Sequence, residues 1–161
     1  MSSEQTTNKD VPGVVMRPPF IFAVFLALGI ALHLTWPVTM VTTSFPLRVG
    51  LGASLALLGV VLAMSGRFQL RRARTQSSPF RPATSVVVEG PYRFSRNPMY
   101  LGMSLIYAGI AFGANSAWML GLLIPLLIVL HYGVIVREEA YLERKFGNSY
   151  LEYRKAVRRW I

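Results

Sequence analysis

Long uncharged stretches divide this chain into segments of membrane-spanning length. They cover residues 18–47, 49–66 and 97–136, which are runs of 30, 18 and 40 residues. An α-helix of about 20 apolar residues crosses the ~30 Å hydrocarbon core of a bilayer, so the longest run holds two crossings. The pattern predicts an all-α integral membrane bundle of about four transmembrane helices.

Turn signals place the ends of these spans. Pro18 and Pro19 suit the first turn of a helix, and Asn97-Pro98 pairs a preferred N-cap residue with proline at the first helical position. Asn115-Ser116 is a turn signal in the middle of the longest run. The predicted spans are therefore residues 18–36, 47–66, 98–114 and 117–136, of which the last two form a tight hairpin.

The charged residues indicate how the spans are oriented. The chain has 17 Lys and Arg against 7 Asp and Glu, a formal net charge of +10, and 14 of the basic residues lie in 67–97 and 137–161. Basic loops stay on the cytoplasmic side, so these two segments and both termini are predicted to be cytoplasmic. We expect a multi-pass protein of the inner or plasma membrane of a prokaryote. Residues 1–17 are expected to be a disordered leader, and residues 18–161 the membrane domain.

Other functional classes find little support. The mean hydropathy is +0.42, and the basic residues flank spans instead of covering a soluble surface, so the expected partner is the bilayer and not nucleic acid. The chain has no cysteine, which excludes disulfides, thiolate metal sites and a cysteine nucleophile. We expect no bound metal. The chemistry must come from the two cytoplasmic segments and the ends of the spans that meet them.

The first cytoplasmic segment contains the string Gly-Pro-Tyr-Arg-Phe-Ser-Arg-Asn-Pro-Met-Tyr-Leu-Gly at residues 90–102. A helix that begins at Asn97-Pro98 presents free N–H groups and the positive end of its dipole, which suit a carboxylate or another anion. The alternative is a simple junction between a loop and a span.

The second segment places charged residues at the end of the last span. His131, Val134 and Glu138 fall at helical spacing i, i+3 and i+7, so an imidazole and an acid are predicted to share one face. Arg137, Glu138 and Glu139 at this boundary form either structural ion pairs or a site. Residues 148–160 are predicted to form an amphipathic helix that lies on an anionic membrane surface, with Tyr150, Leu151, Tyr153, Val157 and Trp160 on its apolar face.

Together these motifs resemble the isoprenylcysteine carboxyl methyltransferase and phospholipid methyltransferase families of integral membrane enzymes. The resemblance implies S-adenosylmethionine bound at the cytoplasmic face and a lipid-like acceptor that arrives through a lateral opening. Matching by position, the implied cofactor contacts are Thr84, Val86, Val87, Tyr92, Asn97, Pro98, Met99, Tyr100, Glu138 and Glu139. Prenylcysteine enzymes often have histidine at the position of Asn97, and an amide cannot titrate, so no acid–base role transfers to it.

The acceptor is left open by the sequence. Arg137 and Glu138 are the predicted catalytic residues, and His131 and Val134 the predicted contacts with the acceptor. Arginine at this boundary favours a small lipophilic carboxylate or thiol, whereas an amine of a phospholipid would lose its proton to Glu138 or His131. The rival of another class is a non-enzymatic four-span lipid-binding or scaffold protein. The sequence does not determine the oligomeric state.

Overall fold

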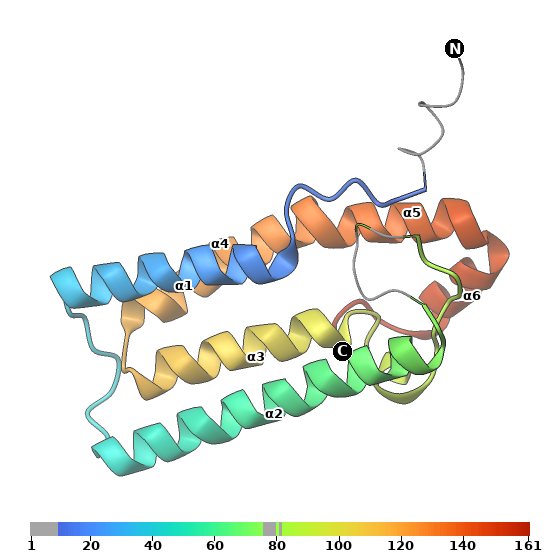
Figure 1. Ribbon diagram of the computed structural model, residues 1–161. Helices are drawn as coiled ribbons and strands as arrows, with labels where there is room; N and C mark the ends of the chain where they lie inside the picture. The colour runs from blue at the N-terminus through green and yellow to red at the C-terminus, as the bar shows by residue number, and fades with distance from the viewer. Residues whose placement is uncertain (1–9, 76–79, 81) are drawn as a thin grey trace.

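The computed structural model describes residues 10–75, 80 and 82–161, and every regular element in that part of the chain is a helix. Four long helices lie side by side, with α1 along α4 and α2 along α3 (Figure 1). Their bounds are Pro18–Thr35 for α1, Phe45–Arg72 for α2, Pro98–Gly113 for α3 and Ala117–Leu130 for α4. The predicted all-α bundle is confirmed, and α2 extends beyond the predicted span at both ends.

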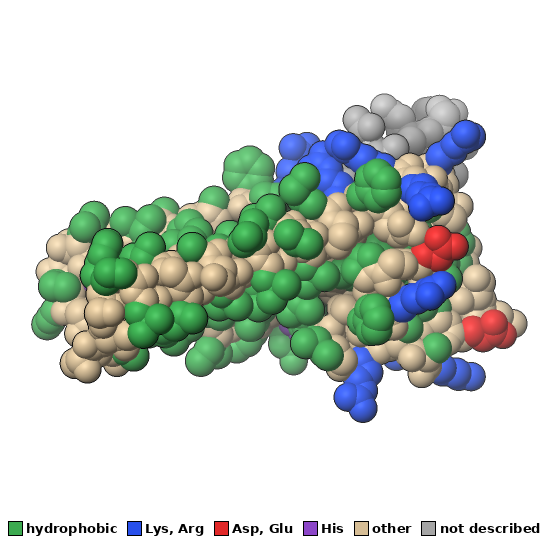
Figure 2. All heavy atoms as spheres, turned by 90° about the horizontal axis from the view of Figure 1, so that it is seen from below, with side chains coloured by type: hydrophobic (Ala, Val, Ile, Leu, Met, Phe, Trp, Pro, Cys, Tyr) green, Lys and Arg blue, Asp and Glu red, His purple; other side chains and the backbone are tan. Residues whose placement is uncertain are grey.

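Three of the helical segments are long and apolar enough to cross a membrane. They are α1, α2 and the continuous segment Ala117–Phe146, and α3 is a shorter apolar helix of 16 residues, or about 24 Å. Figure 2 shows hydrophobic side chains over most of the bundle, with the basic and acidic side chains gathered at one end. This separation is typical of a multi-pass membrane protein.

The helix α4 does not stop at the polar end of the bundle. It continues through a wide π turn, His131–Ile135, into α5, Val136–Phe146. Gly147 ends α5 with a left-handed φ of 54°, which favours glycine, and the chain then turns into α6, Asn148–Ala156. The predicted amphipathic C-terminal helix is wrong in two respects. It ends at Ala156, and its tyrosines Tyr150 and Tyr153 are buried against protein instead of facing a membrane.

Glycines bring α2 and α3 into backbone contact. A Cβ added at Gly59 would lie 2.5 Å from the carbonyl oxygen of Gly102, and one added at Gly52 would lie 2.6 Å from that of Gly109. One heptad further along, a Cβ on Gly66 would lie 3.0 Å from the Met99 side chain. Small residues allow this close approach between membrane helices. The seam ends where α3 begins, and it therefore fixes the start of α3 against α2.

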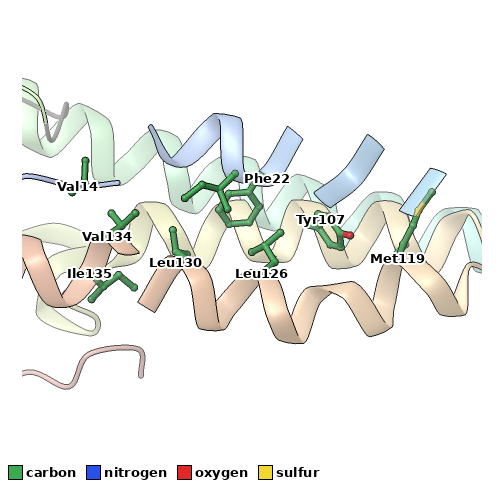
Figure 3. Close-up of a cluster of buried hydrophobic side chains, with 10 residues drawn as sticks. Val14, Phe22, Tyr107, Met119, Leu126, Leu130, Val134 and Ile135 are labelled. Atoms are coloured by element: carbon green, nitrogen blue, oxygen red, sulfur yellow. The ribbon is translucent and has the colours of Figure 1, made fainter. Parts of the chain in front are cut away.

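The other side of α3 packs into a hydrophobic core shared with α1 and α4. Phe22, Tyr107, Met119, Leu126 and Leu130 meet there, and Val134 and Ile135 extend the cluster into the π turn (Figure 3). Close packing of this kind gives a rigid base for the polar end of the bundle.

At the opposite end of the bundle, Asn115 ties the turn between α3 and α4 to the segment between α1 and α2. Its φ of 52° turns the chain from α3 to α4, as the sequence predicts, and its side chain accepts hydrogen bonds from the N–H groups of Met40 and Val41 at 3.0 Å each. The same amide donates to the Val41 carbonyl at 3.0 Å. Ser116 caps α4 by accepting from the N–H of Met119 at 3.3 Å.

The segment 10–17 corrects the prediction of a disordered leader, of which residues 1–9 lie outside the described residues. The N–H of Val15 donates to the Gly133 carbonyl in the π turn at 3.1 Å. Lys145 forms an ion pair with Asp10 at 2.6 Å, and Val14 is buried in the core. The segment is thus a strap along α4 and α5. The sequence does not show that this segment is ordered, because its few apolar residues are buried only by residues that are distant in the chain.

Candidate functional site

A cavity of ≈ 150 Å³ lies at the polar end of the bundle. Its walls come from the end of α2, the segment before α3, the start of α3, and helices α5 and α6. The lining residues are Pro12, Leu70, Thr75, Ala83, Ser85, Val86, Val87, Tyr92, Arg96, Asn97, Pro98, Met99, Tyr100, Glu138, Glu139, Tyr141, Leu142, Tyr150 and Tyr153. Segments far apart in the sequence therefore meet in one pocket, and 13 of its 19 lining residues are aromatic or apolar.

Most of the predicted site residues are brought together in this cavity. Those that line it are Val86, Val87, Tyr92, Asn97, Pro98, Met99, Tyr100, Glu138 and Glu139. Their role as cofactor contacts stays a prediction, but their convergence follows from the fold. The Gly90–Arg93 turn (η2) carries Tyr92, the first turn of α3 carries Met99 and Tyr100, and α5 carries the acidic pair.

Four predicted residues lie outside the cavity lining. Thr84 braces its own loop, since its N–H donates to Thr75 Oγ1 at 2.9 Å and its hydroxyl donates to the Arg74 carbonyl at 3.1 Å. Arg137 is exposed, and its Nη1 donates to the Gly13 carbonyl at 2.9 Å, so it binds the strap. Val134 is fully buried in the helical core.

His131 is the fourth, and the π turn explains its position. α-Helical spacing puts His131 and Glu138 on one face, but a π turn advances the register by about one residue. His131 Nε2 lies 3.2 Å from Arg159 Nη1, whereas Glu138 points into the cavity. The prediction that His131 and Glu138 share one helix face is therefore wrong.

Glu139 sits between two arginines. Arg159 donates to both of its oxygens, from Nε at 2.9 Å and from Nη2 at 2.7 Å, and Arg96 Nη1 lies 3.1 Å from Oε1. The Glu139 and Arg96 side chains are only 8% and 9% exposed, so the group is almost dry. The hydrogen bond from Arg159 to Glu139 raises the pKa of Arg159 and keeps its guanidinium charged. A buried carboxylate with two such partners is a structural anchor.

Arg96 retains unused hydrogen-bonding capacity on the cavity wall. Its Nη1 also reaches the Tyr150 hydroxyl at 3.5 Å, but its buried Nε has no hydrogen-bond partner among the described residues. Buried donors are rarely left unsatisfied, and such a group calls for an explanation. An anion in the cavity would supply the missing acceptor.

Glu138 differs from its neighbour. It accepts a hydrogen bond from the Tyr100 hydroxyl at 2.8 Å, and no ion pair to it is found among residues 10–75, 80 and 82–161. The cavity thus carries an unpaired carboxylate and, on another wall, a guanidinium with a free donor. This arrangement is complementary to a zwitterion.

Tyrosines form the remaining wall. The Tyr153 hydroxyl donates to the Tyr92 carbonyl at 2.8 Å, which ties α6 to the loop before α3. Burial, followed by the nearby Tyr153 and Glu138, raises the pKa of Tyr92, so its hydroxyl stays protonated near neutral pH. A ring face of this kind can stack on a base or contact a cation.

The sequence reasoning missed Arg96, Tyr150 and Tyr153. Arg96 directly precedes the Asn97-Pro98 helix start, and that position was its only local signal. The two tyrosines lie three residues apart, a spacing that also fits a membrane-facing surface. Asn97 is at the N-cap, as predicted, but its side chain does not cap the helix and instead donates to the Arg159 carbonyl at 3.1 Å.

Comparison with known proteins agrees with this geometry. The chain is similar to an uncharacterized protein of Haemophilus influenzae, with 43% identity over 65 residues, which are 39% of this chain and 100% of that protein. No solved structure matches the chain. A family model for phospholipid methyltransferase matches residues 47–149, which include most of α2, all of α3 and α4, and most of the cavity wall. With more than half of its length matched, the chain belongs to the phospholipid methyltransferase family.

Proposed function

We propose that this protein is an integral membrane methyltransferase that uses S-adenosylmethionine as the methyl donor and methylates a lipophilic acceptor at the polar end of the bundle. Family membership supports the class of reaction. The observation that carries the proposal is the cavity itself, in which an unpaired carboxylate, a free guanidinium N–H and aromatic rings converge beside apolar helices.

The residues present fit the donor. Its α-carboxylate matches the unpartnered Nε of Arg96, and its α-ammonium matches Glu138, which lacks a cationic partner. Its adenine and its sulfonium suit the rings of Tyr92, Tyr100 and the α6 tyrosines. Glu139 is held by two arginines, so of the acidic pair we assign the donor contact to Glu138.

The chain has little covalent chemistry to perform. When bound, S-adenosylmethionine supplies an electrophilic methyl group on a positively charged sulfur. The protein has to orient the acceptor in line with that group and exclude water, which the buried tyrosines and the tightly packed start of α3 support. Neither a catalytic triad nor a metal enters this scheme.

The charged residues around the cavity restrict the chemical class of the acceptor. A small lipophilic carboxylate or thiol was favoured by Arg137, but Arg137 is bound to the strap, and Arg96 and Arg159 share Glu139. With Arg96 assigned to the carboxylate of the donor and Glu138 to its ammonium, no arginine of the cavity is left to hold a negatively charged acceptor. This observation favours the amine of a phospholipid over a carboxylate or thiol. The lipophilic part of the acceptor would reach the cavity from the bilayer.

The topology belongs to the same proposal. We place the cavity on the cytoplasmic side, with both termini, because residues 67–97 and 137–161 carry 14 of the 17 basic residues. In this arrangement α3 also crosses the bilayer. It is shorter than the hydrocarbon core is thick, and its packing along the longer α2 reduces the cost of this hydrophobic mismatch.

The test is donor-dependent methylation of a total membrane-lipid extract by the purified protein, with products read by mass spectrometry. We expect new lipids heavier by one methylene unit. After mild base the added methyl group stays on the headgroup if the acceptor is an amine, and it is released as methanol if the acceptor is a carboxylate. Glu138→Gln is expected to abolish most of the product. Glu143→Gln is the matched control, because Glu143 is a half-exposed acid on the same helix that pairs with Arg154. Absence of product from folded protein would favour the non-enzymatic lipid-binding alternative.

A further inference from the structure

The last residues of the chain do not line the cavity, but they pack against the residues just before α3. After α6 the tail has no regular secondary structure, and its backbone is held by the residues just before α3. The N–H of Arg96 donates to the Arg158 carbonyl at 3.0 Å, and Ser95 Oγ donates to the Arg159 carbonyl at 3.3 Å. The Asn97 amide donates to that same carbonyl at 3.1 Å. These contacts direct the Arg159 side chain back toward Glu139.

Charge within this cluster explains why the cavity can attract an anion. Arg96 and Glu139 alone would form a neutral pair, and Arg159 adds the second positive charge that leaves the group with a net charge of +1. Because Arg96 and Glu139 are almost fully buried, water screens these charges poorly. The excess charge therefore acts close to the free Nε of Arg96.

The position of Arg159 has a second effect, which is to limit the contact between Arg96 and Glu139. It occupies both oxygens of Glu139, so Arg96 contacts that carboxylate through Nη1 only, and its buried Nε is left without a hydrogen-bond partner among the described residues. If Arg159 were absent, Glu139 could accept both nitrogens of Arg96 in the usual two-point geometry. Arg96 would then be neutralised and its free donor lost.

We propose that Arg159 is a positioning residue that gives the cavity its affinity for a carboxylate, by supplying the excess charge and by holding Glu139 away from the Nε of Arg96. The proposal rests on the proposed function, since it concerns the amino-acid end of the donor. Arg159 itself need not touch the ligand. It lies outside residues 47–149, which the family model matches.

The experiment compares two ligands that differ at the amino-acid end. S-Adenosylhomocysteine carries the carboxylate, whereas 5′-methylthioadenosine has the same nucleoside and sulfur without it. Binding of each to the full-length protein is measured by calorimetry in detergent. We expect Arg159→Gln to weaken binding of S-adenosylhomocysteine by about tenfold or more and to leave that of 5′-methylthioadenosine within about twofold.

Two further variants separate the effect of the lost charge on binding from a general effect on folding. Arg154→Gln is the matched control, since Arg154 pairs with Glu143 at 2.8 Å on the surface and its removal is expected to change neither affinity. The double variant Glu139→Gln with Arg159→Gln removes one charge of each sign and restores the net charge of +1. It is expected to recover most of the affinity for S-adenosylhomocysteine that Arg159→Gln loses.

The outcomes are distinguishable. The proposal would be overturned if Arg159→Gln lost affinity equally for both ligands, or lost affinity for neither. It would also be overturned if the double variant bound S-adenosylhomocysteine no more tightly than Arg159→Gln does. A wild-type protein that binds neither ligand while folded would instead contradict the proposed function. If Arg159→Gln does not fold, the double variant still decides, because it must bind S-adenosylhomocysteine with near wild-type affinity.

Discussion

The contact between α2 and α3 makes a quantitative prediction, because the cavity depends on where α3 begins. In Gly59→Ala the new Cβ would lie 2.5 Å from the Gly102 carbonyl oxygen and 2.8 Å from the Ile106 nitrogen. Ordinary contact begins at 3.4 Å, so the two backbones must separate by about 0.9 Å. Overpacking of this kind typically costs about 1–3 kcal/mol.

Gly50→Ala is the matched control for this substitution. Gly50 is in the same helix, and a Cβ there meets nothing within 4 Å. Both substitutions gain about 1 kcal/mol of helix propensity, so the difference between them isolates the packing cost. We expect Gly59→Ala to be less stable than Gly50→Ala by about 1–3 kcal/mol in reversible unfolding in detergent. Equal stabilities would refute the close approach of α2 and α3.

Three further predictions concern the strap, the hairpin turn and the cavity. A Cβ on Gly133 would lie 3.8 Å from that of Val15, which suits a disulfide, so Val15→Cys with Gly133→Cys should cross-link on oxidation in this cysteine-free chain. Thiols that remain open to maleimide labelling would show that the strap lies elsewhere. Asn115→Ala removes three hydrogen bonds and should destabilise the protein by about 2–3 kcal/mol in the same unfolding assay. Tyr100→Phe removes the donor to Glu138 and should weaken binding of S-adenosylmethionine about tenfold in calorimetry, and an unchanged affinity would argue against that contact.

Much of the fold was predictable because its signals are local. Proline at Pro18 and Pro98, the turn at Asn115 and the glycine at Gly147 each act within a few residues, and the structure places helix ends at all of them. The length of the uncharged runs reflects the thickness of a bilayer and needs no tertiary information. The contact between α2 and α3 was not predicted, because the seven-residue spacing of the glycines in α2 does not identify the helix that they contact.

What the sequence could not give depends on contacts between distant segments. The strap is held by Gly133, whose carbonyl is available only in the π turn. That turn also separates His131 from Glu138, and helical spacing cannot anticipate it. Arg159 follows the end of α6, and its partner Glu139 is twenty residues away, so nothing local distinguishes it from the solvent-exposed arginines beside it.

The central claim is that the cavity binds the methyl donor through Glu138. Its most direct test is equilibrium binding of labelled S-adenosylmethionine to the purified protein, compared with Glu138→Gln under the same conditions. The account predicts saturable binding at one site per chain and an affinity at least about tenfold lower in the variant, since a charge-assisted hydrogen bond contributes about 1.5–3 kcal/mol. Absence of saturable binding by folded wild-type protein, or equal affinity in the variant, would contradict it.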